Sequence, residues 1–109
     1  MELSLEIETQ DKVIGSSWSL NTIERPTNGV EIKYLGPRLT KSFGIPEALC
    51  FIVHLAETVD LALASAAIYE KFNGKSINRI VINRRTVTNI TKEGIQQVIK
   101  EEKIRIWKE

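Results

Sequence analysis

The stretch from Pro46 to Phe72 constrains the fold most, because no further proline or glycine interrupts it. Pro46 suits the first turn of a helix, and Asn73-Gly74 is typical of a helix end. The pattern predicts one long, apolar, alanine-rich helix, about 40 Å long at 1.5 Å per residue. A compact domain of this size has a radius of gyration of about 13 Å. Such a helix must break, near Ser65, or project and pack against something else.

Shorter segments predict strands and a second helix. Alternation of apolar and polar residues predicts strands at 2–8, 13–23, 30–35 and 103–109, and a hairpin over 77–90 with Asn83-Arg84-Arg85 at its tip. Gly36-Pro37 is expected to end the strand that begins at residue 30. Thr91 is a good N-cap for an amphipathic helix that reaches about Glu102.

These elements predict one α+β domain over residues 1–109. It would have a small antiparallel or mixed sheet, one long apolar helix and one short amphipathic helix. From residue 30 onward the predicted order is strand, helix, strand, strand, helix, strand, which is the ferredoxin-like pattern βαββαβ. The first 23 residues would add a further strand or hairpin.

The polar residues within the long apolar stretch allow two chemical interpretations. A membrane span needs about 20 mainly apolar residues, and Glu57 and Asp60 interrupt this one, so no membrane span is expected. On a helix, Cys50, His54 and Glu57 would share one narrow stripe and could ligate a metal or form a Cys–His couple. Because the chain has one Cys and one His, a metal-dependent enzyme centred on these residues lacks ligands, and no cofactor or metal is expected.

A packing surface is the third interpretation of the same stretch. A helix that is apolar on most sides is normally covered on most sides, and one small sheet covers only one. The sequence therefore predicts contact with a second copy of the chain or with a larger protein partner. The predicted interaction residues of the helix are Ile52, Leu55, Glu57, Val59, Asp60, Ala62, Leu63 and Ala66.

A basic segment around the predicted hairpin is the second candidate site. It contains Lys75, Arg79, Arg84 and Arg85 and no acidic residue. These side chains could bind nucleic acid or an acidic protein partner. The segment has no aromatic residue on which bases could stack, and the chain lacks the glycine patterns that bind nucleotide phosphates. A solvated hairpin tip explains the same charges.

Cysteine usage and the N-terminal residues predict a cytoplasmic setting. The chain has one cysteine, Cys50, so no internal disulfide can form. Its first ten residues, MELSLEIETQ, lack the basic start and apolar run of a signal peptide.

The block from Gly36 to Glu102 combines a loop containing proline, an alanine-rich helix, a basic exit, a hairpin and a capped helix. These parts read PEALCFIVHLAETVDLALASAAIYEKF, INRIVINRRTVTNI and TKEGIQQVIKEE. In this order the block resembles the small effector-associated modules found beside proteases and NTPases in bacterial conflict and defence systems. The resemblance implies a non-enzymatic adaptor without catalytic residues. With the packing surface, it predicts a protein–protein interaction module that forms a homo-oligomer or binds a larger protein.

Overall fold

The computed structural model describes residues 1–9, 19–39, 46–72 and 77–108. Its elements are β1 (Glu2–Thr9), β2 (Ile23–Thr27), β3 (Val30–Leu39), β4 (Pro46–Leu55), α1 (Leu61–Phe72), β5 (Ile77–Ile82), β6 (Arg85–Thr86) and α2 (Lys92–Lys108). The strands form one sheet in the order β2-β3-β4-β1-β5-β6, and each neighbouring pair is antiparallel. The predicted α+β class is confirmed.

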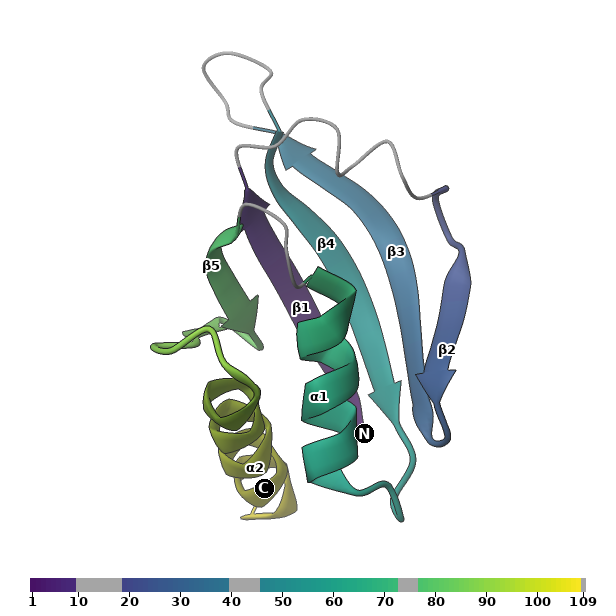
Figure 1. Ribbon diagram of the computed structural model, residues 1–109, viewed down its shortest axis with the longest axis vertical. Helices are drawn as coiled ribbons and strands as arrows, with labels where there is room; N and C mark the ends of the chain where they lie inside the picture. Colours follow the sequence, from purple (N-terminus) through teal and green to yellow (C-terminus); the bar gives the residue numbers. More distant parts are fainter. Residues whose placement is uncertain (10–18, 40–45, 73–76, 109) are drawn as a thin grey trace.

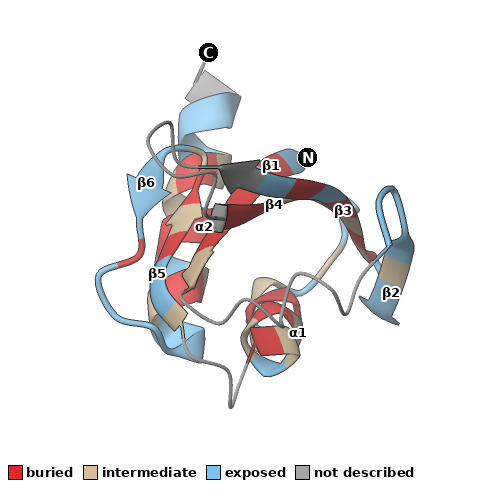
Figure 2. Cartoon of the chain, turned by 90° about the horizontal axis from the view of Figure 1, so that it is seen from above, coloured by how far each residue is buried: buried red, intermediate tan, exposed pale blue. Residues whose placement is uncertain are grey.

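Helix α1 covers one face of the sheet. In Figure 1 it lies in front of β1 and β4, and α2 packs beside it near the end of the sheet where β1 begins. Viewed from above, buried residues gather between α1 and the sheet (Figure 2). Among the described residues, no helix lies over the opposite face at β3 and β4 (Figure 2).

The pairing of β1 with β4 sets the core. Three cross-strand pairs, Leu3 with Val53, Leu5 with Phe51 and Ile7 with Leu49, are buried on the side that faces α1. From β3 and β5 the inward residues Ile32, Tyr34, Ile80 and Ile82 extend these rows. Because side chains alternate along a strand, every second residue of the same strands points to the other face.

Lys71 joins α1 to the edge strand β2. Its ammonium group pairs with the Glu24 carboxylate, and its side chain is only 9% exposed. The same nitrogen lies 5.9 Å from the ring centroids of Phe51 and Phe72. A cation held between a carboxylate and two aromatic rings fixes the edge strand against the helix.

The predicted helix over residues 46–72 is wrong in its first half, because Pro46–Leu55 is strand β4. The buried residues Leu49, Phe51, Val53 and Leu55 alternate with the more exposed Cys50, Ile52 and His54. The lack of glycine and proline favours a helix, yet the period of two is present in the same residues. The strand forms because β4 pairs with β1 on one side and β3 on the other, and because its β-branched and aromatic side chains favour strands.

The break in this stretch lies between β4 and α1 rather than near Ser65. Asp60 caps α1, because its Oδ1 accepts a hydrogen bond from Ala62 N at 2.8 Å. Ser65 lies inside the helix, fully buried, and its hydroxyl donates to Leu61 O at 2.7 Å. The helix is therefore too short to project from the domain.

The predicted ferredoxin-like order is also wrong. From residue 30 the elements run β3, β4, α1, β5, β6 and α2, because α2 occupies the predicted last strand at 103–109 as far as Lys108. Buried Ile95, Ile99 and Glu102 lie on one helical face. The alternating Ile104 and Ile106 that suggested a strand are both exposed.

In the N-terminal half, some strand boundaries differ from those predicted from the sequence. The strand predicted at 2–8 is confirmed as β1, and the one predicted at 30–35 continues as β3 to Leu39. Its register against β4 shifts between Tyr34 and Gly36, so a bulge carries the strand through Gly36-Pro37. Most of the strand predicted at 13–23 lies outside the described residues.

Thr91 caps α2 as predicted, and the close approach of Asn89 explains the glycine that follows. Thr91 Oγ1 accepts a hydrogen bond from Gly94 N at 3.0 Å. A Cβ added at Gly94 would lie 2.0 Å from the backbone oxygen of Asn89. That oxygen also accepts a hydrogen bond from Thr91 N at 2.9 Å, so it cannot move away without breaking the turn.

We expect Gly94→Ala to lower the free energy of unfolding by about 2 kcal/mol or more. Glycine to alanine in an exposed helix interior normally gains about 1 kcal/mol, so the clash reverses the usual sign. Urea unfolding followed by far-ultraviolet circular dichroism measures the change. Lys100→Ala, at an exposed position of the same helix, is the control and should change stability by less than about 0.5 kcal/mol. A neutral or stabilising Gly94→Ala would contradict the contact.

Candidate interaction surfaces

The face of the sheet opposite α1 is the first candidate surface. Its side chains form cross-strand rows. One row joins Glu2, His54 and Glu31, the next joins Ser4, Ile52, Lys33 and Ile23, and a third joins Val81, Glu6 and Cys50. These ten residues, with Arg25, Glu8 and Arg79, are called the open face below. The rows place residues distant in the chain side by side.

The centre of the open face is apolar and its surroundings are charged. Ile23 is 45% exposed, and Cys50, Ile52 and Val81 are half-buried. An apolar centre within a polar rim is the arrangement typical of protein–protein contact surfaces.

A shallow hollow of about 200 Å³ lies within this face. Ile23 and Ile52 contribute its apolar part, and Glu2, Glu31, Lys33 and His54 contribute its polar part. The hollow is smaller than the roughly 300–1,000 Å³ of a typical small-molecule site. Its size suits a side chain of a protein partner better than a cofactor.

Most charges of the open face are matched within the chain. Arg25 Nε lies 3.0 Å from Glu31 Oε1, and His54 Nδ1 lies 4.0 Å from Glu2 Oε1. Lys33 makes no ion pair with the residues that the structure describes. These side chains are largely exposed, so each pair contributes little to stability, about 0–1 kcal/mol.

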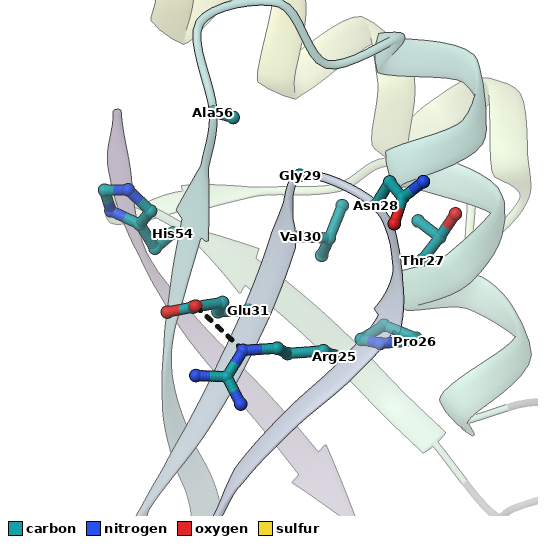
Figure 3. A pocket seen from close by; sticks show the side chains of 9 residues that line it. All are labelled: Arg25, Pro26, Thr27, Asn28, Gly29, Val30, Glu31, His54 and Ala56. Carbon is teal, nitrogen blue, oxygen red and sulfur yellow. Dashed lines mark hydrogen bonds and ion pairs between the residues drawn. The ribbon is translucent and has the colours of Figure 1, made fainter.

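A second recess of about 660 Å³ adjoins the β2–β3 hairpin (Figure 3). Its residues do not converge on one point. Arg25, Glu31 and His54 lie on one side of the hairpin, whereas Thr27 and Asn28 lie on the side of α1. The recess therefore follows the outside of the hairpin and does not assemble a catalytic group.

A crevice of about 520 Å³ lies between the start of β1, the β4–α1 connection and the end of α2. Its walls are mainly apolar and include Leu55, Val59 and Ile106. Its charged groups are Glu57, Lys103 and the N-terminal ammonium of Met1, which donates to Leu55 O at 2.9 Å. One carboxylate and two ammonium groups beside the Thr58 hydroxyl, with no histidine or cysteine in the lining, do not make an acid–base or nucleophilic pair.

The predicted interaction residues of the long helix are divided between different surfaces. Ile52 lies on the open face, Leu55 is buried in the core and Glu57 is exposed in the connection. Val59 packs against the core, and Asp60 is the cap of α1. On α1 itself Ala62 and Leu63 are exposed, Leu63 by 59%, and Ala66 is half-buried. The single helical surface expected from the sequence does not exist.

Cys50, His54 and Glu57 do not share a stripe. Cys50 and His54 point to the same face of β4, where residues four apart are about 13 Å apart, and Glu57 lies beyond the strand. Within the described ranges, no three His, Cys, Asp or Glu residues are grouped so that they could hold a metal ion. The helical argument that grouped these three residues is therefore wrong.

The basic residues of the hairpin are also separated. Arg79 projects from the open face and pairs with Glu8, with Nη2 and Oε1 2.5 Å apart, whereas Arg85 pairs with Glu101 of α2. Arg84 is exposed in the turn with a φ of 67°. Lys75 lies outside the described residues. The hairpin and its turn at Asn83-Arg84 are confirmed, but the described arginines do not form one cationic patch.

Comparison with known proteins finds no matching family model, curated protein or solved structure. Neither α1 nor α2, the helices in the described part of the chain, is long and apolar enough to cross a membrane. What the chain does must therefore be inferred from its own surfaces.

The sequence interpretation missed much of the open face. Of its residues only Ile52 and Arg79 were predicted to contact a partner. Alternation in residues 2–8 and 30–35 shows which side chains share a face. It does not show which face α1 will cover, because that depends on the order of the strands.

The contacts of Glu101 link the hairpin to α2 in a pH-dependent way. Gln97 Nε2 donates a hydrogen bond to Glu101 Oε1 at 2.8 Å, and Arg85 pairs with the other oxygen. The Gln97 hydrogen bond first, and then the Arg85 guanidinium, hold the pKa of Glu101 below its ordinary value of 4.5. A lowered carboxyl pKa adds stability above pH 4.5, and this stability is lost as the pH falls through the folded-state pKa.

We therefore expect Glu101→Gln to unfold at lower urea concentration than the wild type at pH 7. The difference should shrink toward zero as the pH falls below 4.5, the ordinary value for this carboxyl group. Urea unfolding midpoints between pH 3 and 7 would measure this difference. Gln97→Ala removes only the hydrogen bond from Gln97 to Glu101 and should show a smaller effect of the same kind. A difference between wild type and variant that is independent of pH would contradict this account.

Proposed function

We propose that the protein acts by binding another protein through the open face, without catalysing a reaction. The observation that carries the proposal is a sheet with α1 on one face and a partly apolar opposite face. Ile23, Ile52 and Val81 lie in neighbouring rows there, and an apolar centre of this kind is stabilised when a partner removes it from water. The proposal keeps the protein–protein interaction expected from the sequence but moves it from a helix to the sheet.

The resemblance to effector-associated adaptor modules supports a binding role and remains part of the proposal. Such a module would use no cofactor and would work beside a larger protein or a second copy, in the cytoplasm. The surfaces described above contain no grouped acid, base and nucleophile, which is compatible with a non-enzymatic role.

Binding of nucleic acid is the weaker alternative. Phosphate contacts need several basic side chains that are free to reach the backbone. Glu8 and Glu101 already pair with Arg79 and Arg85. Lys33 is the basic residue of the open face without an ion pair among the described residues. Glu31 lies two residues away on the same face of β3, and Glu2 lines the same hollow.

Site-specific photocrosslinking tests the proposed surface. The full chain would carry p-benzoylphenylalanine in place of Ile52 or Ile23 on the open face, or in place of Leu63 on α1 as a control. We expect the two open-face positions to give adducts with the same polypeptide, identified by mass spectrometry, and the control to give none with it. Adducts from the Leu63 position only would place binding on the helix and overturn the proposal.

A further inference from the structure

We infer that the partner of the open face is a second copy of this chain, packed face to face with its two-fold axis along β4. This inference rests on the proposed function and names its partner. Strand β4 is central, since β3 and β2 lie on one side of it and β1 and β5 on the other. Packed sheets are aligned to within about 30° and lie about 10 Å apart. The result is a sandwich of two sheets with an α1 on each outer side.

The strand order decides what meets across such an interface. Rotation about an axis along β4 places Ile52 against Ile52 of the second copy. It also places β1 over β3 of the second copy, and β5 over β2. Val81 of β5 and Ile23 of β2 lie in neighbouring rows, so they meet across the interface. The apolar residues of one face thus contact the apolar residues of the other.

Charge favours this axis over the alternative. Lys33 of β3 would lie over Ser4 of the second copy, with Glu2 and Glu6 two residues away on either side of that Ser4. An axis perpendicular to the strands would instead place β1 over β1 and bring its three glutamates, Glu2, Glu6 and Glu8, together. The chosen axis also brings Glu2 near Glu31 of the second copy. Glu31 already pairs with Arg25 of its own chain, and His54 Nδ1 lies 4.0 Å from Glu2, a pair that is ionic only when the imidazole is protonated.

The size of the open face suits a dimer. Strands β2, β3, β4, β1 and β5 contribute to it. With about 4.8 Å between strands and about 3.4 Å per residue, five strands of about seven residues span on the order of 500 Å² before side-chain relief is counted. A specific interface buries about 800 Å² per partner. The open face is therefore of the order that a stable pair needs.

Substitution at the axis tests the inference, because each copy then places the new charge against itself. We expect wild type to sediment as a dimer. Ile52→Lys should raise the dissociation constant by about 30-fold or more, as for a central interface residue. Lys33→Glu should also weaken the dimer. Leu63→Lys, at the exposed position of α1, should leave the constant unchanged. Urea unfolding of the three variants at low concentration confirms that each is folded.

Crosslinking through Cys50 tests the axis. The chain has one cysteine, so any crosslink between two copies joins Cys50 to Cys50. Sheets about 10 Å apart hold these residues too far apart for a disulfide, whose Cα atoms are about 4.4–6.8 Å apart. A short bis-maleimide would span them. We expect rapid crosslinking of the wild type and of Leu63→Lys, and little crosslinking of Ile52→Lys.

The outcomes separate this inference from the proposed function. A dimer that Leu63→Lys dissociates and Ile52→Lys does not would overturn the inference and point to α1. If the chain stays monomeric at high concentration while photocrosslinking from positions 23 and 52 captures another protein, the inference that the partner is a second copy is overturned. The open face remains the proposed binding surface in that case. A monomer with no adduct from the open face would contradict both.

Discussion

The antiparallel pairing of β1 with β4 is the interaction on which the rest of the structure depends. It joins residues 2–8 to residues 48–54, and it places three pairs of large apolar side chains in the core. Each fully buried side chain of this kind contributes about 1.5–3 kcal/mol relative to its exposed state. Strands β3 and β5 then add to the outer edges of this pair. The short connection to α1 returns the chain across the buried face, and α2 packs against α1.

The same pairing explains which features follow from the sequence and which do not. Strand β1, the β5–β6 hairpin and the Thr91 cap depend on local alternation and capping, and they were predictable. Strand β4 was not, because its residues lack a breaker and their helical and strand patterns compete. Residues 2–8 lie far away in the sequence, and pairing with them on one side and with the neighbouring strand β3 on the other decides the competition. The last turns of α2 were missed for a related reason, because Ile104 and Ile106 alternate although neither is buried.

The candidate surface follows from the same long-range constraint. Once Leu49, Phe51 and Val53 face α1, Cys50, Ile52 and His54 must face the other way. The sequence predicts Ile52 as an interaction residue of a helix, whereas Ile52 belongs to strand β4. The helical spacing that groups Cys50, His54 and Glu57 is absent from β4. The arginines of the hairpin were expected to share one surface, but β5 and β6 direct Arg79 and Arg85 to different partners.

The central claim is that the open face, and not the helical face, is the contact surface. Methyl-resolved nuclear magnetic resonance with a soluble paramagnetic agent, at low and high protein concentration, tests it most directly. The account predicts that the methyl groups of Ile23, Ile52 and Val81 lose paramagnetic relaxation as concentration rises, while those of Leu63 keep theirs. Protection of Leu63 with an unchanged open face would contradict the account.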